Sequence, residues 1–452
     1  MGPSVVLRKG PGRLSLLGGT PSRGSYVFAS AGILGSRVPT PTLALHLGEC
    51  QGGPVPATAR LRGVDLDAFR WLLTDDGQAV LARAVEETAD LAHDELAIQA
   101  QLRRSHSADH VAAALTQAEL RRRAVPKFGD LAARLYFTPD GLEQATRMRV
   151  ATHRAGRLQA ADTRSAVDLG CGIGGDLLAF ARAGITAAGV ELDPVRVAVA
   201  QANLAALELD GAVLEADATT LDTSPFDVAF ADPARRGDRG RTFHVEEWTP
   251  PWTFVEGLLR RDACVKVAPG IPHGLVPDGV EAEWVSDRGE VKEAALWSGR
   301  LATVARRATV IGAGGLATLT EEDDPGSDVG DLGAFLYEPD GAVIRAGLVT
   351  AVAAGVGGRL IDRKIAYVTS EESFRTPFAR SYRVLEQLPY REKPLRAALR
   401  ARGIGTLTIK KRGVDVSPEQ LRKRLALHGE DEATLVLTRA RGEGVALLVK
   451  PF

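Results

Sequence analysis

Apolar residues recur at every third or fourth position from about residue 64 to residue 160 of the chain. The stretch LDAFRWLLTDDGQAVLARAVEETADLAHDELAIQAQL has this spacing, and SADHVAAALTQAELRRRA repeats it. Such a period places the apolar side chains on one face of a helix. The pattern predicts a small helical domain over residues 61–140.

The first 60 residues have a different composition. They are rich in Gly, Pro and Ser, they show no period, and no acidic residue precedes Glu49. A segment without an apolar pattern cannot bury enough surface to offset the entropy lost on folding. We expect a disordered tail over residues 1–60. An organellar leader is the less favoured alternative, because no amphipathic helix is evident.

Short apolar runs alternate with helical patterns after residue 160. SAVDLGCGIGGDLLAFARAG is typical of a strand, a glycine-rich turn and a helix. Further strands are indicated in AAGVELD, GAVLEADATTL and FDVAFADPARR. Strands that alternate with helices form parallel sheets. The pattern predicts an α/β domain over residues 141–320.

Three glycines, Gly170, Gly172 and Gly174, lie in the turn after the first of these strands. They let the backbone approach a ligand, and the next helix directs its first N–H groups toward that ligand. Their spacing also matches the dinucleotide fingerprint, so the glycines alone do not identify the ligand. Asp168 does discriminate, because its carboxylate would repel a pyrophosphate and accept hydrogen bonds from an ammonium group.

Two more carboxylates stand at strand ends. Glu191 ends the second strand about 20 residues further on, where it is placed to accept from both ribose hydroxyls of a nucleoside. Asp217 ends the third strand, where it is placed to accept from an adenine amino group. Each alone is compatible with an ordinary strand-end carboxylate, but their order with the glycine loop favours a binding site.

This ordered set of signals resembles the class I S-adenosylmethionine-dependent methyltransferases over about residues 140–320. The resemblance implies a Rossmann-like seven-stranded sheet and S-adenosyl-L-methionine as the cofactor. It also implies that Asp168 and the loop from Gly170 to Gly174 hold the methionine end, Glu191 the ribose and Asp217 the adenine.

A second glycine-rich stretch, ATVIGAGGLATLT at residues 308–320, resembles the start of a flavin or nicotinamide site. No helix is expected after it, since the next segment is the acidic loop TEEDDPGSDVGD. We interpret the stretch as a tight hairpin between the last two strands of the methyltransferase sheet.

The fourth strand ends in FADPARRG, which contains Asp232, Pro233 and Arg235. In methyltransferases acting on exocyclic amines, this strand ends in Asp or Asn, Pro, Pro and an aromatic residue. A carboxylate there orients a weakly nucleophilic amine. Here Ala234 and Arg235 replace the aromatic end. An arginine can stack on a base or bind a phosphate, and Phe243 or Trp248 is available as a substitute ring. The alternative is an Asp-Pro that caps a helix.

The DPARRG form resembles a bacterial group of methyltransferases with a THUMP-like C-terminal domain. LEQATRMRVATHRA, VKVAPGIPH, GEVKEAALW and LYEPDGAVIRAGLV also match, and the likeness extends from about residue 64 to the end. A connecting α/β segment is expected over residues 321–379. Residues 380–452 are expected to form a small α+β domain with the order strand, helix, strand, helix and a two-stranded hairpin.

Charge is unevenly distributed along the chain. Residues 380–452 contain 16 Lys and Arg against 8 acids, a net charge of about +8, which leaves about −9 on the remainder. Such a split indicates a polyanionic partner, and THUMP-type domains bind RNA. A solvated basic face is the alternative. The residues expected to bind RNA are Lys410, Lys411, Arg412, Arg422, Lys423 and Arg424.

The sequence gives little indication of a disulfide scaffold, a metal site or a membrane span. Three cysteines without shared spacing exclude a disulfide scaffold and favour a reducing cytoplasm. No metal site and no membrane span are expected. A base nitrogen of RNA is the favoured methyl acceptor. A non-catalytic RNA-binding protein that retains the cofactor fold, and a methyltransferase of a protein or small molecule, are the alternatives.

Overall fold

The computed structural model describes residues 65–89, 95–235 and 248–452, together with four short strands nearer the N-terminus. These strands are β1 (Ser4–Arg8), β2 (Leu16–Leu17), β3 (Val27–Phe28) and β4 (Thr42–His46), in the order β2-β3-β1-β4. Most of residues 1–60 lies outside the described residues, so the disordered tail stays a prediction.

The chain divides into two compact units. The first comprises Met1–Lys266 with Trp297–Leu301, and the second comprises Val267–Leu296 with Ala302–Phe452. Each is described below through its own helices, strands and side-chain contacts.

The helical domain expected from the three- to four-residue period is present. Its helices are α1 (Leu66–Leu72), α2 (Asp75–Ala89), α3 (Glu95–Leu102), α4 (Ala108–Phe128), α5 (Pro139–Gln144) and α6 (Met148–Ala160). Side-chain oxygens start several of them: Asp65 accepts from the N–H of Ala68, and Ser107 from that of His110. Phe69 and Leu72 on α1 are fully buried, as the apolar period requires.

A nine-stranded sheet carries the expected α/β domain, in the order β15-β14-β12-β13-β11-β8-β5-β6-β7. Its strands are β5 (Ser165–Leu169), β6 (Thr186–Glu191), β7 (Gly211–Glu215), β8 (Val228–Ala231), β11 (Ala263–Val267), β12 (Glu281–Asp287), β13 (Glu290–Ser298), β14 (Arg306–Gly312) and β15 (Gly315–Thr320). The sheet has nine strands where seven were expected. Its edge pair, β14 and β15, is the antiparallel hairpin expected at the glycine-rich stretch 308–320.

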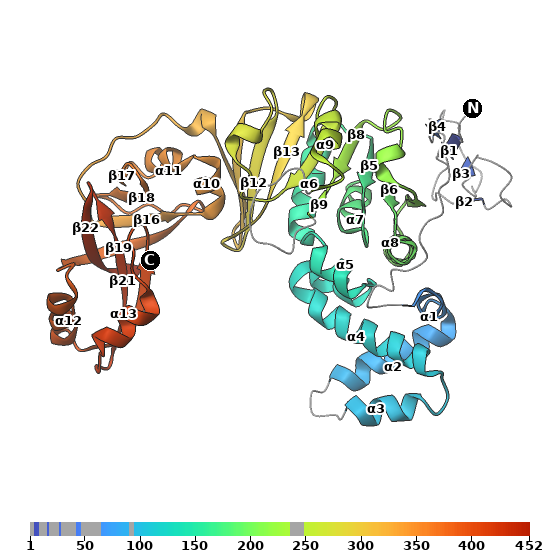
Figure 1. Cartoon of the computed structure of the whole chain (residues 1–452), viewed down its shortest axis with the longest axis horizontal. Coiled ribbons are helices and arrows are strands. Elements are labelled where there is room, and N and C mark those ends of the chain that lie inside the picture. The colour runs from blue at the N-terminus through green and yellow to red at the C-terminus, as the bar shows by residue number, and fades with distance from the viewer. Residues whose placement is uncertain are drawn as a thin grey trace. The chain divides into compact units, whose positions relative to one another are not determined.

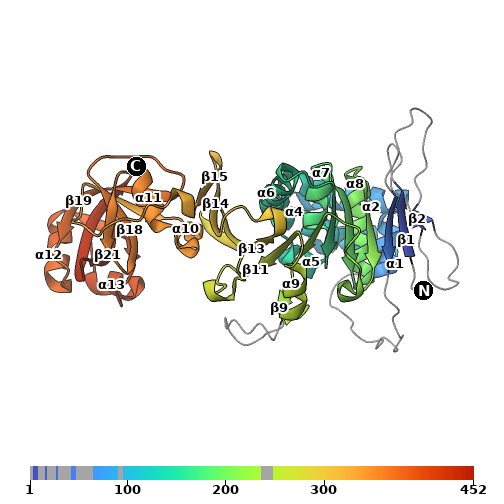
Figure 2. The same cartoon turned by 90° about the horizontal axis from the view of Figure 1, so that it is seen from above.

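Parallel pairing places the carboxyl ends of β5, β6 and β8, where the candidate site residues stand, at the same edge of the sheet. β5 pairs in parallel with β6 on one side and with β8 on the other. The helices α7 (Gly175–Arg182) and α8 (Pro194–Ala206) pack beside β5, β6 and β7 (Figure 1, Figure 2). The chain turns in opposite directions on the two sides of β5, and ligands of α/β sheets bind at the carboxyl ends of strands at such a point.

A second sheet of seven strands lies in the C-terminal part, in the order β17-β18-β16-β19-β22-β21-β20. Its strands are β16 (Phe335–Pro339), β17 (Arg359–Asp362), β18 (Ile365–Ser370), β19 (Ala379–Leu388), β20 (Ile404–Lys411), β21 (Asp431–Ala440) and β22 (Glu443–Pro451). The expected order of strands and helices after residue 380 is found. The segment expected as a connection, 321–379, contributes β16, β17 and β18 to this same sheet.

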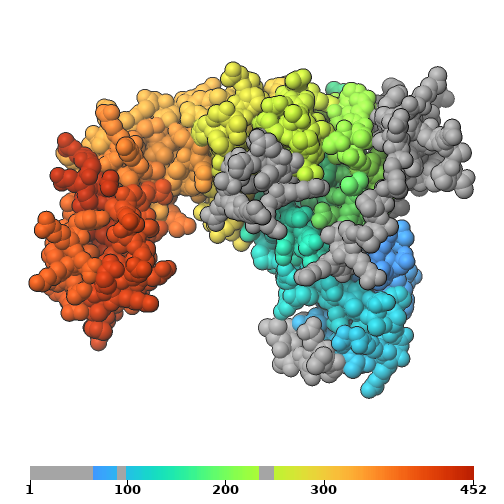
Figure 3. Space-filling model, in the orientation of Figure 1, coloured from blue at the N-terminus to red at the C-terminus, as the bar shows by residue number. Residues whose placement is uncertain are grey.

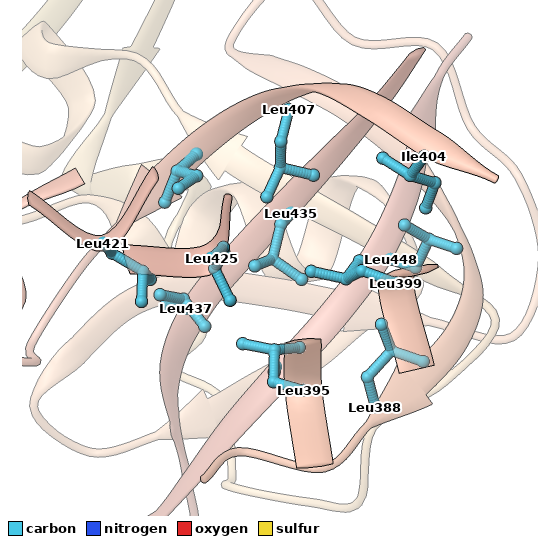
Figure 4. Close-up of a cluster of buried hydrophobic side chains, with 12 residues drawn as sticks. Leu388, Leu395, Leu399, Ile404, Leu407, Leu421, Leu425, Leu435, Leu437 and Leu448 are labelled. Carbon is cyan, nitrogen blue, oxygen red and sulfur yellow. The ribbon is translucent and has the colours of Figure 1, made fainter. Parts of the chain in front are cut away.

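The helices α12 (Glu392–Ala401) and α13 (Pro418–Leu425) cover one end of this second sheet. A buried cluster holds them there, and its members come from both helices and from four strands. They include Leu388, Leu395, Leu399, Ile404, Leu407, Leu421, Leu425, Leu435, Leu437 and Leu448 (Figure 4). The helices α10 (Gly341–Ala346) and α11 (Val349–Gly355) belong to the same part of the chain.

Candidate active site

The glycine loop after β5 has a backbone that other residues rarely adopt. Gly170, Gly172 and Gly174 have φ values of +84°, +56° and +92°. A Cβ atom added at Gly170 or Gly172 would meet no atom within 4 Å and would project into open space beside the loop. Side chains there would therefore strain the turn and fill the space next to its N–H groups. The loop has the form of a cradle for a ligand.

Glu191 fastens this loop to the end of β6. Its Oε2 accepts from the N–H of Gly172 at 2.9 Å, and its Oε1 accepts from those of Leu192 at 2.8 Å and Asp193 at 3.0 Å. An ionised carboxylate has about four acceptor positions, so roughly one remains for a ligand hydroxyl. The ribose contact expected of Glu191 stays a prediction, and the carboxylate also has a structural role in the loop.

Asp168 is buried at the base of the loop, with 2 % of its surface exposed. No described residue forms an ion pair with it. Its pKa lies well above the usual range because of burial and of the nearby carboxylates Asp176 and Asp232, although Arg154 opposes the shift. A buried carboxylate without its own cation beside an open glycine cradle fits the ammonium group of S-adenosylmethionine.

A buried ion pair below the loop was not anticipated from the sequence. Arg154 on α6 is 1 % exposed, and its Nε lies 2.9 Å from Oδ1 of Asp176 on α7. The guanidinium also stacks 4.6 Å from the ring centre of Phe230. The available signal was a lone arginine among the buried positions Val150 and Leu158, one helical turn away on either side. The pair joins the helix before β5 to the helix after it.

Asp232 lies immediately after β8, at the same sheet edge as the glycine loop. The register pairs Leu169 with Ala231, so the two strands deliver Gly170 and Asp232 side by side. Oδ2 of Asp232 lies 2.6 Å from Nζ of Lys266 on β11, and the same ammonium donates to Oγ1 of Thr146 at 3.1 Å. The sequence did not single out Lys266 as a site residue.

The rest of the DPARR segment runs on as a strand. Pro233 is buried, and β9 (Ala234–Arg235) pairs with β10 (Trp248–Thr249) in antiparallel register, Arg235 opposite Trp248. Because a strand follows Pro233, the alternative in which Asp232 caps a helix does not fit. Trp248 is one of the two residues expected to supply a substitute ring. The other, Phe243, lies outside the described residues.

The side chain of Asp217 accepts hydrogen bonds from a residue of its own turn, Thr219. Asp217 starts the 3-10 turn Ala218–Thr220, and its Oδ1 accepts from the N–H of Thr219 at 2.9 Å and from the Thr219 hydroxyl at 2.7 Å. The side chain is exposed at the carboxyl end of β7. These bonds explain the residue as a turn cap, and its contact with adenine stays a prediction.

Most of the six basic residues expected to bind RNA already have partners within the second sheet. Nζ of Lys410 lies 2.6 Å from Oε2 of Glu338, and Arg412 approaches the same carboxylate at 3.9 Å. The other contacts are those of Arg422 with the carbonyl of Leu407 at 3.1 Å and of Arg424 with Glu392 at 2.8 Å. Lys411 and Lys423 are exposed. Four of the six therefore help to hold this sheet and its helices together.

The described cysteines, Cys171 and Cys264, are free and buried. Burial raises the pKa of the Cys171 thiol well above its ordinary value, and the charges of Asp168 and Glu191 raise it further. Neither thiol has the exposed setting of a nucleophilic cysteine. Within the described ranges, no helix is long and apolar enough to cross a bilayer, and no three acidic, His or Cys side chains converge as a metal site would require.

Comparison with known proteins identifies the fold and the family. Family models match three parts of the chain: one described as a methyltransferase domain over residues 166–235, one as THUMP domain-like over residues 379–451, and one as a domain of unknown function over residues 65–124. A structure from Porphyromonas gingivalis W83, provisionally described as a methyltransferase, superposes with a TM-score of 0.66 at 22% identity and covers 83% of this chain and 98% of its own. That likeness shows the fold.

Two relatives are close enough in sequence to show the family. They are uncharacterized S-adenosylmethionine-dependent methyltransferases from two strains of Mycobacterium tuberculosis, CDC 1551 and H37Rv. Each is 39% identical over 331 residues, which cover 71% of this chain and 90% of the relative. The chain belongs to the class I S-adenosylmethionine-dependent methyltransferases, uses S-adenosylmethionine as its cofactor and carries a THUMP-like domain in its C-terminal part.

Proposed function

We propose that the protein transfers the methyl group of S-adenosylmethionine to a base nitrogen of RNA. The observation that carries the proposal is the position of Asp232. It follows β8 directly beside the glycine cradle that follows β5, so an acceptor at this carboxylate would lie next to the cofactor.

The chemistry of an exocyclic amine suits this arrangement. Its lone pair is delocalised into the ring, so the amine reacts only when its N–H bonds are directed and its lone pair is aimed at the methyl carbon. S-adenosylmethionine supplies an electrophilic methyl group on a sulfonium. Asp232 accepts one N–H of the amine through an oxygen, while Lys266 at 2.6 Å holds Oδ2 and thereby the orientation of the carboxylate. The nitrogen gains the methyl group from sulfur, which leaves the neutral thioether S-adenosylhomocysteine, and gives up one proton to water.

Pro233 and Arg235 are assigned to the acceptor side. Pro233 fixes the backbone where it leaves β8, since its ring restricts φ. Arg235 binds the acceptor by stacking on the base or by contacting a phosphate. Trp248 is the partner of Arg235 in the backbone register of β9 and β10.

RNA is favoured as the acceptor by two further observations. The family model over residues 379–451 is THUMP domain-like, and residues 380–452 carry 16 basic against 8 acidic side chains. A polyanion is the partner that such a charge balance favours. A protein or small-molecule acceptor would not need this domain.

Mass spectrometry of nucleosides tests the proposal. Total RNA from a deletion strain should lack one methylated nucleoside that its parent contains, and the wild-type gene should restore it. A gene carrying Asp232→Ala should fail to restore it, whereas Asp210→Ala, a control at an exposed carboxylate, should succeed. Identical nucleoside profiles in parent and deletion strain, with methyl transfer to protein or small molecules by the purified enzyme, would refute RNA as the substrate.

A further inference from the structure

Two faces of the second sheet can be assigned from the alternation of its strands. Leu336, Tyr382 and Val449 pack in one buried cluster on one face. Their neighbours along the strands, which point to the opposite face, include Phe335 on β16, Arg383 on β19 and Lys450 on β22. The register places Arg383 opposite both Phe335 and Lys450. These side chains therefore form a row across three adjacent strands.

The two cations of this row are open to solvent, and Phe335 is partly buried. Arg383 and Lys450 are exposed, and neither forms an ion pair within the part of the chain that the structure describes. Phe452 adds a second ring, whose centre lies 5.3 Å from that of Phe335 at an interplanar angle of 70°. Phe452 is 42% exposed and the nearby Leu385 is 53% exposed. We call Phe335, Arg383, Lys450 and Phe452 the aromatic–basic strip.

Helices cover other parts of the same face. The leucine cluster of Figure 4 includes Leu388 and Leu448, which belong to β19 and β22 and lie beneath α12 and α13. The strip occupies the positions of these strands that the cluster does not reach. In Figure 1, β16, β19 and β22 lie between α11 and the pair α12 and α13, and Figure 3 shows the surface of this domain in orange and red.

Fold stability does not explain why Arg383 and Lys450 are paired. Like charges directly opposite each other in an antiparallel pair are destabilising, and no acidic side chain among the described residues forms an ion pair with either. The repulsion between Arg383 and Lys450 would be relieved if a bound anion lay between their side chains. The exposed ring of Phe452 and the partly buried ring of Phe335, beside two unpaired cations, then indicate the kind of anion. Bases stack on aromatic side chains, while basic residues bind the phosphates between them.

We propose that the aromatic–basic strip binds a single-stranded segment of RNA. The inference rests on the proposed function and names the surface that presents the substrate. The bases stack on Phe335 and Phe452, and successive phosphates contact Arg383 and Lys450. A single strand is specified because the bases of a duplex are stacked on one another and their faces are closed to a protein ring. The strip differs from the six basic residues expected from the sequence, of which four are engaged within the domain.

Fluorescence anisotropy of the full chain with a labelled oligouridylate of about 12 nucleotides tests the strip. The double variant Arg383→Glu, Lys450→Glu should raise Kd at least about tenfold. It should also lower the slope of log K against log salt by about 1.4, since each phosphate contact on a single strand contributes about 0.7. Phe452→Ala should raise Kd about 5- to 100-fold, whereas Phe452→Trp should retain binding.

A stability readout separates binding from folding. The single variant Arg383→Glu creates an opposite-charge pair with Lys450, so its melting temperature should equal or exceed that of the wild type while RNA affinity falls. The matched control is Arg391→Glu, Lys393→Glu, which reverses two exposed charges of the same domain. This control should change Kd much less than the strip variants do.

The outcomes distinguish the strip from the proposed function. Loss of affinity in the Arg391 and Lys393 control, with normal binding in the strip variants, would overturn the strip and leave an RNA substrate in place. No measurable binding of the oligouridylate by the wild type at about 50 mM salt, while the deletion strain lacks a methylated nucleoside, would also overturn the strip alone. No binding and no change in the nucleosides would overturn both.

Discussion

Cofactor binding should release a proton from Asp168. Its pKa lies well above the ordinary range because of burial and the nearby Asp176 and Asp232, with Arg154 opposing. The free protein therefore keeps this proton to a higher pH than an exposed aspartate does. The ammonium group of the cofactor favours the ionised carboxylate. The complex then binds fewer protons than the free protein, and cofactor affinity must rise with pH.

The steepness of the pH dependence of cofactor affinity follows from the release of one proton on binding. Below the pKa of Asp168 in the free protein, the association constant for S-adenosylhomocysteine should rise about tenfold per pH unit, and above it the affinity should level off. Asp168→Asn keeps the shape and removes the charge. Leaving a buried ammonium without its partner costs about 2–5 kcal/mol, which corresponds to at least about a 30-fold rise in Kd.

Isothermal calorimetry in two buffers with different ionisation enthalpies counts the released protons directly. The count should approach one at low pH and fall to zero at high pH in the wild type, and should be zero throughout in Asp168→Asn. Asp217→Asn, at an exposed carboxylate of the same sheet, should leave the count unchanged. A wild-type affinity that is independent of pH, or an Asp168→Asn variant with the wild-type slope, would refute the assignment of Asp168 to the ammonium.

The same carboxyl affects the stability of the free protein with a definite sign. Its folded pKa is raised above the unfolded value of about 3.9. Its stabilising contribution is therefore fully present below that unfolded value and is lost as the pH rises through the folded pKa. At neutral pH, Asp168→Asn should raise the melting temperature of the free protein while it weakens cofactor binding. A variant that lowered both would point to general damage at the site.

Three further predictions concern turnover and stability. Asp232→Ala should lower the methyl-transfer rate about 10²–10³-fold with cofactor affinity nearly unchanged, and Asp232→Asn should keep more activity; a fully active Asp232→Ala enzyme would end the amine proposal. Cys171→Ala and Cys264→Ala should retain turnover in a radiolabel transfer assay, because both thiols are buried, whereas a covalent adduct with a fluorinated pyrimidine RNA would contradict this. Leu399→Ala, at a fully buried position of the cluster in Figure 4, should lower the free energy of unfolding by about 2–5 kcal/mol; an unchanged denaturation midpoint would contradict the packing.

The sequence by itself determined the features that depend on neighbouring residues. The strand, the glycine loop and the helix after it follow one another within about 20 residues, so period and turn chemistry are sufficient to predict them. Asp168, Glu191 and Asp232 could be named as candidates for the same reason, since each stands at or next to the end of a strand. The order of helices and strands after residue 380 was also readable from local alternation.

Only the tertiary structure decided which distant side chains meet. Arg154 and Asp176 are 22 residues apart, and Lys266 reaches Asp232 across 34. Both contacts depend on helix packing or on strand order, which local patterns do not specify. The sequence predicted the hairpin of β14 and β15, but its position beside β12 depends on strand order and not on a local pattern.

The basic residues give the clearest contrast. Counting charges identified a basic domain, but it could not tell which cations are free, because Glu338 lies 72 residues from Lys410 in the sequence and 2.6 Å from it in the structure. Arg383 and Lys450 attract no attention in the sequence and become neighbours only through the pairing of β19 with β22. The net charge of a domain depends on composition alone. Whether a given cation has an ionic partner depends on the register of strands that lie far apart in the chain.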